Sequence, residues 1–235
     1  MILIKLQHVA SRFKNVFIFR DHIKSIMKFL FLLYKLGRLI QRTFEQIAAL
    51  LNTCKVGIAG AGGLGSNCAV ALSRIGIGEL VIADFDVVNA GNLNRQYFFR
   101  DQIGKKKVFA LRDNIQRINP DCQVFAHDLK ICEEHVFPLF SGCDVIVEAF
   151  DAADQKKMLV EACITRLPNI PLVCGSGLAG YGSNNSITTQ QWGNIYICGD
   201  QNNEVSETLP PMAPRVGIVA NMQANQVVEI LLQNK

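Results

Sequence analysis

The chain has 235 residues, of which 49% are hydrophobic and 19% are charged. This composition excludes a largely disordered chain and is sufficient for one large domain with a buried core. The formal net charge of +4 is unevenly distributed, because residues 1–55 hold ten Lys or Arg against two acids and the rest hold fourteen against eighteen. We therefore expect a basic, mostly helical N-terminal extension over residues 1–54 and a slightly acidic domain over residues 55–235.

Eight cysteines are scattered through the chain and none forms a C-x-x-C pair. This pattern favours a reducing, cytoplasmic location over a disulfide framework, and it does not support a structural zinc site. The apolar run at 27–34 ends at Lys35 and Arg38 and is too short to span a membrane. We expect a basic amphipathic helix that packs on the domain or on a partner, with attachment to an anionic membrane surface as the alternative. Met27 is also an alternative start site for translation of the chain.

From residue 55 onward, short apolar runs alternate with segments of helical spacing. Strands are predicted at 55–60, 79–83, 123–127, 144–149 and 170–174, and helices at 64–75, 104–118, 153–166 and 216–232. This order predicts an α/β fold of the Rossmann-like, doubly wound type with a mainly parallel sheet. Two further β segments, at 184–190 and 194–198, predict an antiparallel C-terminal portion. Residues 199–215, with three prolines, predict a long loop.

A glycine-rich loop, Gly60-Ala61-Gly62-Gly63-Leu64-Gly65, lies between the first predicted strand and the first predicted helix. Glycine allows the backbone to turn tightly and to approach a phosphate, which then sits at the helix N-terminus. Asp84 ends the next strand, where an acid commonly binds ribose hydroxyls. These features predict a nucleotide site but fit an NAD-linked oxidoreductase as well as an ATP-using enzyme.

The residues after Asp84 favour ATP. Asn92, Arg95 and Gln96 follow within a dozen residues, and Lys105-Lys106-Lys107 begins a predicted helix. Basic groups near a ribose-binding acid suit a triphosphate, because they can neutralise charge on a leaving pyrophosphate. None of the four histidines is well placed to serve as the proton donor of a dehydrogenase.

The chain resembles the ThiF/MoeB/HesA family of adenylyltransferases, which are related to ubiquitin-activating enzymes. The matching segments are Gly60 to Ser66, Asp84 to Gln96, and Ile103 to Val108 with Arg117-Ile118-Asn119-Pro120. Within the family the chain is most similar to the short form of the ThiF branch, which lacks paired zinc cysteines. The segments Met212 to Ile218 and Met222 to Asn225 carry that likeness.

The resemblance implies roles for particular residues. ATP would lie over the loop, with nucleotide contacts from Gly60, Gly62, Gly63, Gly65, Asp84, Asp86, Asn92, Arg95 and Lys107. Asp84 would hold the ribose, and Asn92, Arg95 and Lys107 would contact the phosphates. Catalysis would rest on Asp151, Arg95 and Lys107, with Asp151 also binding Mg²⁺. Relatives usually have Asn after that aspartate, so Ala152 is a departure that weakens nucleotide contacts in this interpretation.

The resemblance also implies a reaction and partners. A small sulfur carrier protein of the ThiS type, ending in Gly-Gly, would be adenylated at its C-terminal carboxylate during thiamine (thiazole) biosynthesis. We expect a homodimer and no nucleic-acid partner. Relatives complete the site with an arginine of the other subunit, and Arg38 or Arg42 could serve in that way, although each is more simply an ordinary arginine on a helix surface. Cys174 or Cys198 could carry sulfur, although each is more simply a buried strand residue. The alternatives are the molybdopterin carrier, a tRNA threonylcarbamoyladenosine dehydratase, an NAD-linked oxidoreductase, and a non-catalytic dimeric scaffold.

Overall fold

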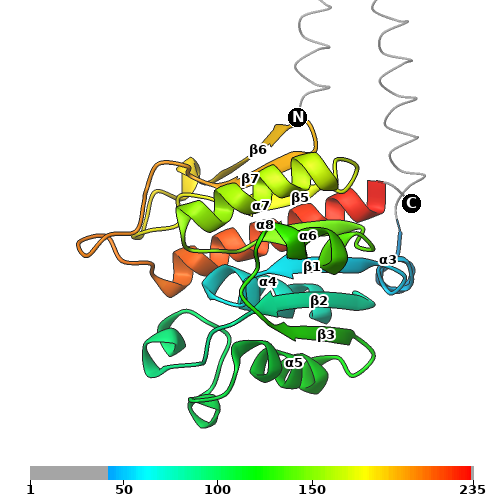
Figure 1. Cartoon of the computed structure of the whole chain (residues 1–235), viewed down its shortest axis with the longest axis horizontal. Helices are drawn as coiled ribbons and strands as arrows, with labels where there is room; N and C mark the ends of the chain where they lie inside the picture. Colours follow the sequence, from blue (N-terminus) through cyan, green and yellow to red (C-terminus); the bar gives the residue numbers. More distant parts are fainter. Residues whose placement is uncertain (1–41, 234–235) are drawn as a thin grey trace, which may run out of the picture. The chain divides into compact units, whose positions relative to one another are not determined.

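The computed structural model describes residues 42–233, and the compact unit that contains the predicted site begins at Phe44. Its centre is a seven-stranded sheet in the order β3-β2-β1-β4-β5-β7-β6 (Figure 1). Only the β6–β7 pair is antiparallel. The strands are β1 (Lys55–Ala59), β2 (Glu79–Asp84), β3 (Gln123–Asp128), β4 (Val145–Glu148), β5 (Leu172–Gly175), β6 (Thr188–Trp192) and β7 (Ile195–Gly199). The predicted α/β, mainly parallel sheet with an antiparallel C-terminal portion is confirmed.

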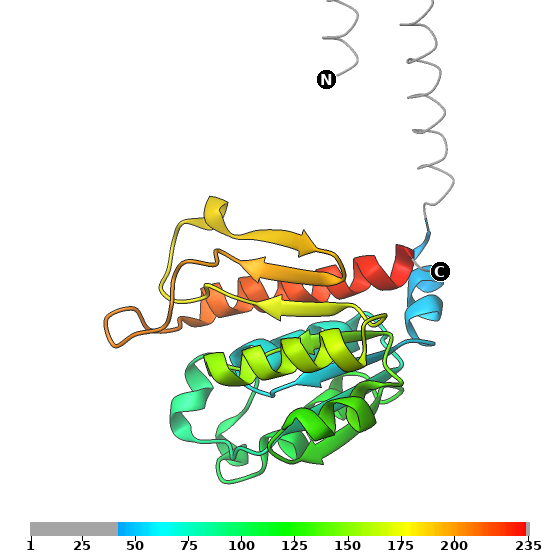
Figure 2. The same ribbon diagram turned by 45° about the horizontal axis from the view of Figure 1, so that its top comes forward.

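Helices cover both faces of this sheet (Figures 1 and 2). One apolar core forms between the sheet and α4, α5 and α8, and a second forms between the sheet and α6 and α7. The helices are α3 (Phe44–Leu51), α4 (Gly63–Arg74), α5 (Lys107–Ile118), α6 (Glu133–Phe140), α7 (Ala153–Arg166) and α8 (Ala213–Gln233). The central strands β1 and β4 are buried on both sides, as continuous apolar runs predict.

Three helices differ from the prediction by more than one residue. Helix α5 begins three residues late because Gly104 takes a positive φ of 90°, which a helix does not continue through. Helix α8 begins three residues early, with Pro214 in the first turn, where its missing N–H is not needed. Helix α6 was not predicted at all, because it has only eight residues and contains Pro138.

Helix α3 precedes the expected domain start at residue 55 and yet packs on the core. Its buried Leu51 belongs to the larger core, and a Cβ on Gly76 would lie 3.4 Å from the Ala48 Cβ. The expected division of the chain at residue 55 stays a prediction. The apolar run at 27–34, Met27 and Arg38 lie outside the described residues.

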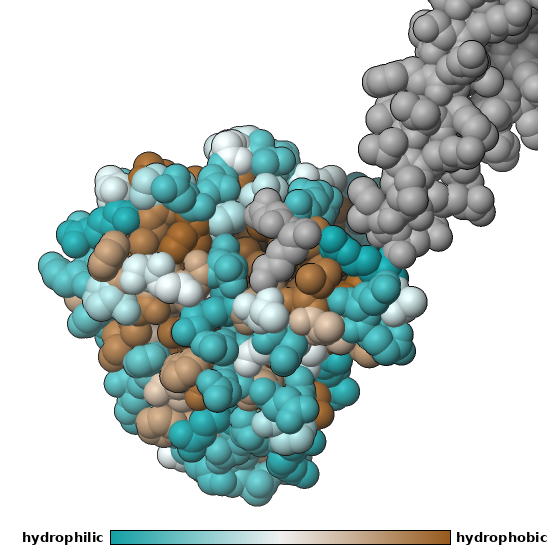
Figure 3. Space-filling model, turned by 90° about the vertical axis from the view of Figure 1, so that its right-hand side faces the viewer, coloured by the Kyte–Doolittle hydropathy of each residue, from teal (hydrophilic) through white to brown (hydrophobic). Residues whose placement is uncertain are grey.

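On the face seen in Figure 3, hydrophobic residues reach the surface in separate areas between hydrophilic ones. Within residues 42–233, none of the helices has the length and apolar character needed to cross a bilayer.

Candidate functional site

The topology singles out one edge of the sheet. The chain passes from β1 through α4 to β2 on one side, whereas β4 pairs with β1 on the other side. In open α/β sheets, ligands bind beyond the carboxyl ends of the strands where the direction of winding reverses. Here that point lies between the ends of β1 and β4, where Gly60 of the glycine loop faces Ala149.

The glycine loop fits closely between these strand ends. Gly60 has a φ of 103°, and a Cβ there would lie 2.8 Å from the Ala149 carbonyl oxygen. A Cβ on Gly65 would overlap the Gly60 carbonyl oxygen, so the first turn of α4 packs directly on the loop. Gly62 has open space, because the atom nearest to the position that a Cβ would take there, Gln96 Nε2, is 3.9 Å away. The loop thus turns tightly at Gly60 and stays accessible at Gly62.

Asp84 is tied to this loop by its carboxylate. Ala61 N–H donates to Oδ2 at 2.6 Å, and Asp86 N–H donates to Oδ1 at 2.7 Å. Burial raises the pKa of the Asp84 carboxyl above its ordinary value, although the two backbone donors and Lys107 oppose this shift. Each carboxylate oxygen has a second lone pair, so the group can still accept a hydroxyl from a ligand.

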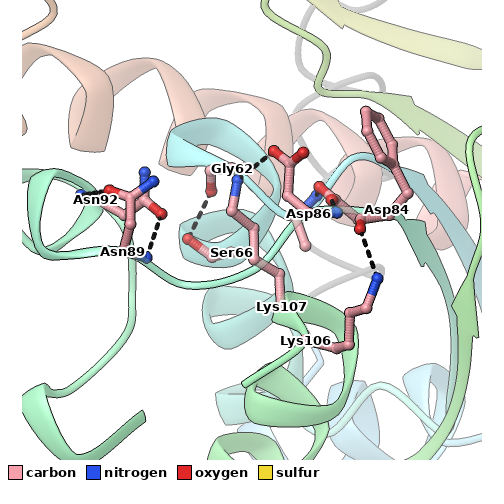
Figure 4. A network of polar contacts seen from close by, with 10 residues as sticks. Gly62, Ser66, Asp84, Asp86, Asn89, Asn92, Lys106 and Lys107 are labelled. Atoms are coloured by element: carbon pink, nitrogen blue, oxygen red, sulfur yellow. Dashed lines mark hydrogen bonds and ion pairs between the residues drawn. The ribbon is translucent and has the colours of Figure 1, made fainter. Parts of the chain in front are cut away.

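Asp86 and Lys107 form an ion pair beside Asp84, with Lys107 Nζ 2.7 Å from Asp86 Oδ2 (Figure 4). The Lys107 side chain is 6% exposed, whereas the Asp86 side chain is 47% exposed. Lys107 N–H also donates to the Asp86 carbonyl at 3.0 Å, which fixes the start of α5 against the segment after β2. Lys106 Nζ donates to the Phe85 carbonyl at 3.0 Å and lies 3.0 Å from the Asp128 carboxylate of β3. Of these two lysines, Lys107 is the buried one, and its Nζ pairs with the carboxylate two residues after Asp84.

Asn92 has a structural role that the sequence did not predict. It forms reciprocal hydrogen bonds with Asn89, in which each side-chain oxygen accepts the other residue's backbone N–H, at 3.1 and 2.9 Å (Figure 4). These bonds cap the 3₁₀ turn at Ala90–Asn94. Among the described residues, none accepts a hydrogen bond from Asn92 Nδ2. That amide group therefore remains available as a donor.

Arg95 lies over the start of α4. Its Cγ is 3.7 Å from the position a Cβ on Gly63 would take, and its backbone oxygen accepts from Asn67 Nδ2 at 2.9 Å. The guanidinium donates to Asn94 Oδ1 at 2.8 Å, an exposed and weak contact. Helix N-termini attract anions, so a cation at this position adds to the same field. The structure brings Arg95 and the glycine loop together.

Asp151 is separate from these groups along the chain but lies at the same edge of the sheet. It follows β4 in the turn 149–152, in which Asp151 and Ala152 are exposed, whereas Ala149 is buried and contacts the glycine loop. Within the described residues, no group of three or more His, Cys, Asp or Glu converges as a metal site. Mg²⁺ commonly takes one or two carboxylates together with waters and substrate phosphates. A single exposed carboxylate therefore fits that ion.

The sequence did not predict two ion pairs that contain a buried carboxylate. Asp200 and Arg215, each 2% exposed, pair at the start of α8, and Arg215 Nη1 also donates to the Gly182 carbonyl at 2.6 Å. Glu148, at the end of β4, pairs with Lys156 of α7 at 2.9 Å. A carboxylate at the end of an otherwise apolar strand was the available signal for Glu148. The long loop offered no periodic signal for Asp200.

The two cysteines considered as sulfur carriers are buried strand residues, as the simpler interpretation predicted. Cys174 lies in β5 and Cys198 in β7, with 7% and 0% exposure. Burial raises the pKa of both thiols, and a contact with Thr189 only partly opposes this for Cys198. Neither thiol is open to a macromolecular partner in this structure. Arg38, one of the two candidate trans arginines, lies outside the described residues.

Two surface hollows have linings of their own. One of about 620 Å³ lies between β6 and α8, and one of about 420 Å³ lies beside the 3₁₀ turn at Ala90–Asn94. Neither includes the glycine loop, Asp84 or Lys107.

The sequence is similar to those of known proteins. The chain is 30% identical over 180 residues to the sulfur carrier protein ThiS adenylyltransferase of Escherichia coli, covering 74% of this chain and 70% of that one. It is 32% identical over 193 residues to the adenylyltransferase and sulfurtransferase MOCS3 of Dictyostelium discoideum, covering 76% of this chain but only 43% of that protein.

Among solved structures, the E. coli tRNA N6-threonylcarbamoyladenosine dehydratase in complex with ATP matches with a TM-score of 0.68. The sequence identity is 25%, and the match covers 79% of this chain and 89% of that one. The ThiF family model matches residues 36–235, which includes every element described above. The chain therefore belongs to the ThiF family.

Proposed function

We propose that this protein is an adenylyltransferase that uses ATP to activate the C-terminal carboxylate of a small carrier protein. The observation that carries the proposal is the set of groups at the switch point of the sheet. At this edge of the sheet lie the open glycine loop, the Asp84 carboxylate bound to it, and the cations Arg95 and Lys107. Asp151 lies on the turn beside them. That set suits a nucleoside triphosphate.

Each group has a role in this proposal. Asp84 accepts ribose hydroxyls, while backbone N–H groups of Gly62 and Gly63 lie against the phosphates. Arg95 and Asn92 Nδ2 donate to phosphate oxygens. Lys107 exchanges part of its contact with the half-exposed Asp86 for a phosphate oxygen, so its charge remains compensated throughout. Asp151 would hold Mg²⁺, which when bound supplies charge neutralisation on the phosphates.

The reaction requires little proton transfer. A carboxylate oxygen of the carrier attacks the α-phosphorus of ATP, a new P–O bond forms, and the bond to the bridging oxygen breaks to release pyrophosphate. The attacking carboxylate is already ionised at neutral pH, so no general base is needed. Both reactants are anionic, so positioning and charge neutralisation by Arg95 and Lys107 supply most of the rate.

The carrier is proposed to be of the ThiS type, with a Gly-Gly tail, in thiazole biosynthesis. The E. coli ThiS adenylyltransferase, of which the chain covers 70%, supports this choice. The solved E. coli structure is that of a tRNA dehydratase, so a tRNA substrate is the competing outcome. The protein is further proposed to be a cytoplasmic homodimer. Measurement of its molar mass in solution by light scattering tests the dimer.

ATP–pyrophosphate exchange tests the proposal directly. We expect exchange that depends on a Gly-Gly-tailed carrier of the ThiS type and disappears when the carrier's last glycine is deleted. Exchange only with a molybdopterin carrier would keep the reaction and change the partner. ATP-dependent turnover only with modified tRNA would replace the carrier by tRNA. Absence of turnover with all three would reject the enzymatic proposal, and binding of NAD in preference to ATP would reject the nucleotide.

A further inference from the structure

Glu148 is a buried carboxylate that the proposed reaction does not use. It is the last residue of β4, it is 1% exposed, and it precedes Asp151 by three residues. Lys156 Nζ lies 2.9 Å from each of its two carboxylate oxygens, and Phe150 N–H donates to Oε1 at 2.7 Å. Lys156 Nζ also donates to the Gly175 carbonyl at 3.0 Å. The pair therefore connects the ends of β4 and β5 with α7.

Stability alone does not explain such a pair. Burial raises the pKa of the Glu148 carboxyl, with Lys156 and the backbone N–H groups of Phe150 and Gly175 opposing the shift. The Glu148 carboxylate is removed from water, whereas the Lys156 side chain is 27% exposed. Removing a charge from water costs free energy that the attraction of its partner often only balances, and replacement of such pairs by apolar side chains is often neutral or stabilising. The hydrogen bonds of the pair indicate what else it does.

Those bonds fix the turn that carries Asp151. The turn begins with Ala149, whose N–H donates to the Ala59 carbonyl at 2.9 Å and whose carbonyl faces Gly60. The next N–H, from Phe150, is held by the Glu148 side chain. On the other side of the strand, Gln223 of α8 donates to the Glu148 carbonyl at 2.8 Å. Glu148 is thus held in place through its backbone and directs the following two residues through its side chain.

We propose that Glu148 and Lys156 act as a positioning pair that sets the turn 149–152, and with it the Asp151 carboxylate, against the glycine loop. This inference rests on the proposed function: its kinetic consequence rests on the adenylation reaction, and its binding consequence rests on the Mg²⁺ role proposed for Asp151. Displacement of a reacting group by about 1 Å can cost about 10²-fold in rate. A pair that only positions Asp151 affects turnover more than it affects ATP binding.

The test uses Glu148→Gln, Lys156→Met and the double variant. Glu79→Gln is the matched control, because Glu79 pairs with Lys55 at the opposite end of the sheet, at 2.5 Å. In ATP–pyrophosphate exchange we expect each single change to lower kcat by about 10- to 100-fold with less than about a threefold change in KM for ATP. The double variant is expected to be no slower than the slower single variant, because either single change already breaks the Glu148–Lys156 pair and the effects of the two changes therefore do not add. Glu79→Gln is expected to match the unmodified protein.

Calorimetric titration of ATP supplies a readout without turnover. In EDTA, all variants are expected to bind ATP as the unmodified protein does, whereas the gain in affinity on adding Mg²⁺ is expected to fall in Glu148→Gln and Lys156→Met. Lys156→Arg keeps the charge and the donors and is expected to recover most of kcat. If Lys156→Met does not fold, Lys156→Arg and Glu148→Asp replace it in the test. Glu148→Asp is expected to lower kcat, because its shorter side chain draws the carboxylate away from Lys156.

Unchanged kcat and Mg²⁺ gain in the folded variants would overturn the inference. Equal loss of ATP affinity in EDTA and Mg²⁺ would overturn it too, because the pair would then support the fold in general. If the unmodified protein shows no exchange with any carrier, the proposed function fails, but the Mg²⁺-dependent ATP affinity still decides the positioning role.

Discussion

The polar contacts at the carboxyl ends of the strands differ between the two halves of the sheet. In the β1–β2 half, a backbone N–H group and a half-exposed carboxylate make the contacts, as in Ala61 to Asp84 and Asp86 to the buried Lys107. In the β5–β7 half, the fully buried Asp200–Arg215 pair joins the loop after β7 to the start of α8. The first half can exchange partners with a ligand, whereas the second cannot lose a partner without loss of stability.

The energies of the two kinds of pair explain this contrast. In the Lys107–Asp86 pair the lysine is buried but the Asp86 carboxylate is half-exposed, so a phosphate oxygen can take over part of the Lys107 contact while Asp86 turns to water. Removing one partner of a buried pair leaves an uncompensated charge and costs about 3–5 kcal/mol. We therefore interpret the β1–β4 edge as the site of chemistry and the Asp200–Arg215 pair as the support for the loops beside it.

The largest expected effect is on catalysis, in Asp151→Ala. Loss of the proposed Mg²⁺ ligand removes several kcal/mol of charge stabilisation, so turnover in pyrophosphate exchange is expected to fall by about 10³-fold or more. ATP affinity in EDTA is expected to stay unchanged, because the glycine loop and Asp84 remain. Asp154→Ala, an exposed acid in the first turn of α7, is the control. A rate for Asp151→Ala near that of Asp154→Ala would show that the metal ligand lies elsewhere.

The next effect is on stability, in Asp200→Asn. Burial raises the pKa of the Asp200 carboxyl, but the N–H groups of Asn202 and Asn203 and the Arg215 charge outweigh burial and hold it below 3.8. We expect the free energy of unfolding in urea at pH 7 to fall by about 3–5 kcal/mol. Asp113→Asn, which breaks an exposed pair with Arg112, is expected to cost less than about 1 kcal/mol.

The pH dependence follows from the lowered pKa of Asp200. A depressed carboxyl pKa contributes stability that is fully present above the ordinary value of 3.8 and is lost as the pH falls through the folded value. The difference between the original protein and Asp200→Asn is therefore expected to persist from pH 7 to about pH 4 and to shrink only below it. A difference that already vanishes near pH 6 would contradict the assignment of the pair.

The same contrast explains what the sequence could predict. Strands and helices of the β1–β4 half follow from apolar runs, glycines and helical spacing, and the glycine loop and Asp84 follow from their place between these elements. The Asp200–Arg215 pair comes from a loop without periodicity, where partners 15 residues apart meet only after α8 has packed on the sheet. Helix α6 gave too short a signal, and the reciprocal Asn89–Asn92 bonds depend on a turn that no apolar pattern marks.

Arg95→Ala tests the exchangeable half at an intermediate magnitude. Loss of one donor to a developing charge commonly costs about 10²–10³-fold in kcat. We expect a loss of that size in the exchange rate, with ATP affinity changed by less than about tenfold, because the glycine loop still binds the phosphates. Arg100→Ala, an exposed arginine on the neighbouring 3₁₀ turn, is the control. An equal loss in both variants would indicate a general effect of surface charge, not a specific phosphate contact.

The smallest expected effect lies between the two halves, at Ala152. This residue is the N-cap of α7 and has the extended backbone (φ −85°, ψ 129°) typical of that position, but it has no side chain that could accept a hydrogen bond from the first turn. Ala152→Ser is expected to raise the free energy of unfolding by about 1 kcal/mol and the Tm by roughly 2–4 °C.

Ala153→Ser, one residue further and inside the helix, is the matched control for Ala152→Ser and is expected to be neutral or slightly destabilising. Ala152→Asn adds the same cap together with an amide beside Asp151. If ATP affinity rises in Ala152→Asn but not in Ala152→Ser, the amide contacts the nucleotide and the alanine weakens that contact in this chain. If both variants gain stability alone, Ala152 affects only the helix, and the nucleotide depends on the glycine loop, Asp84 and the cations beside it.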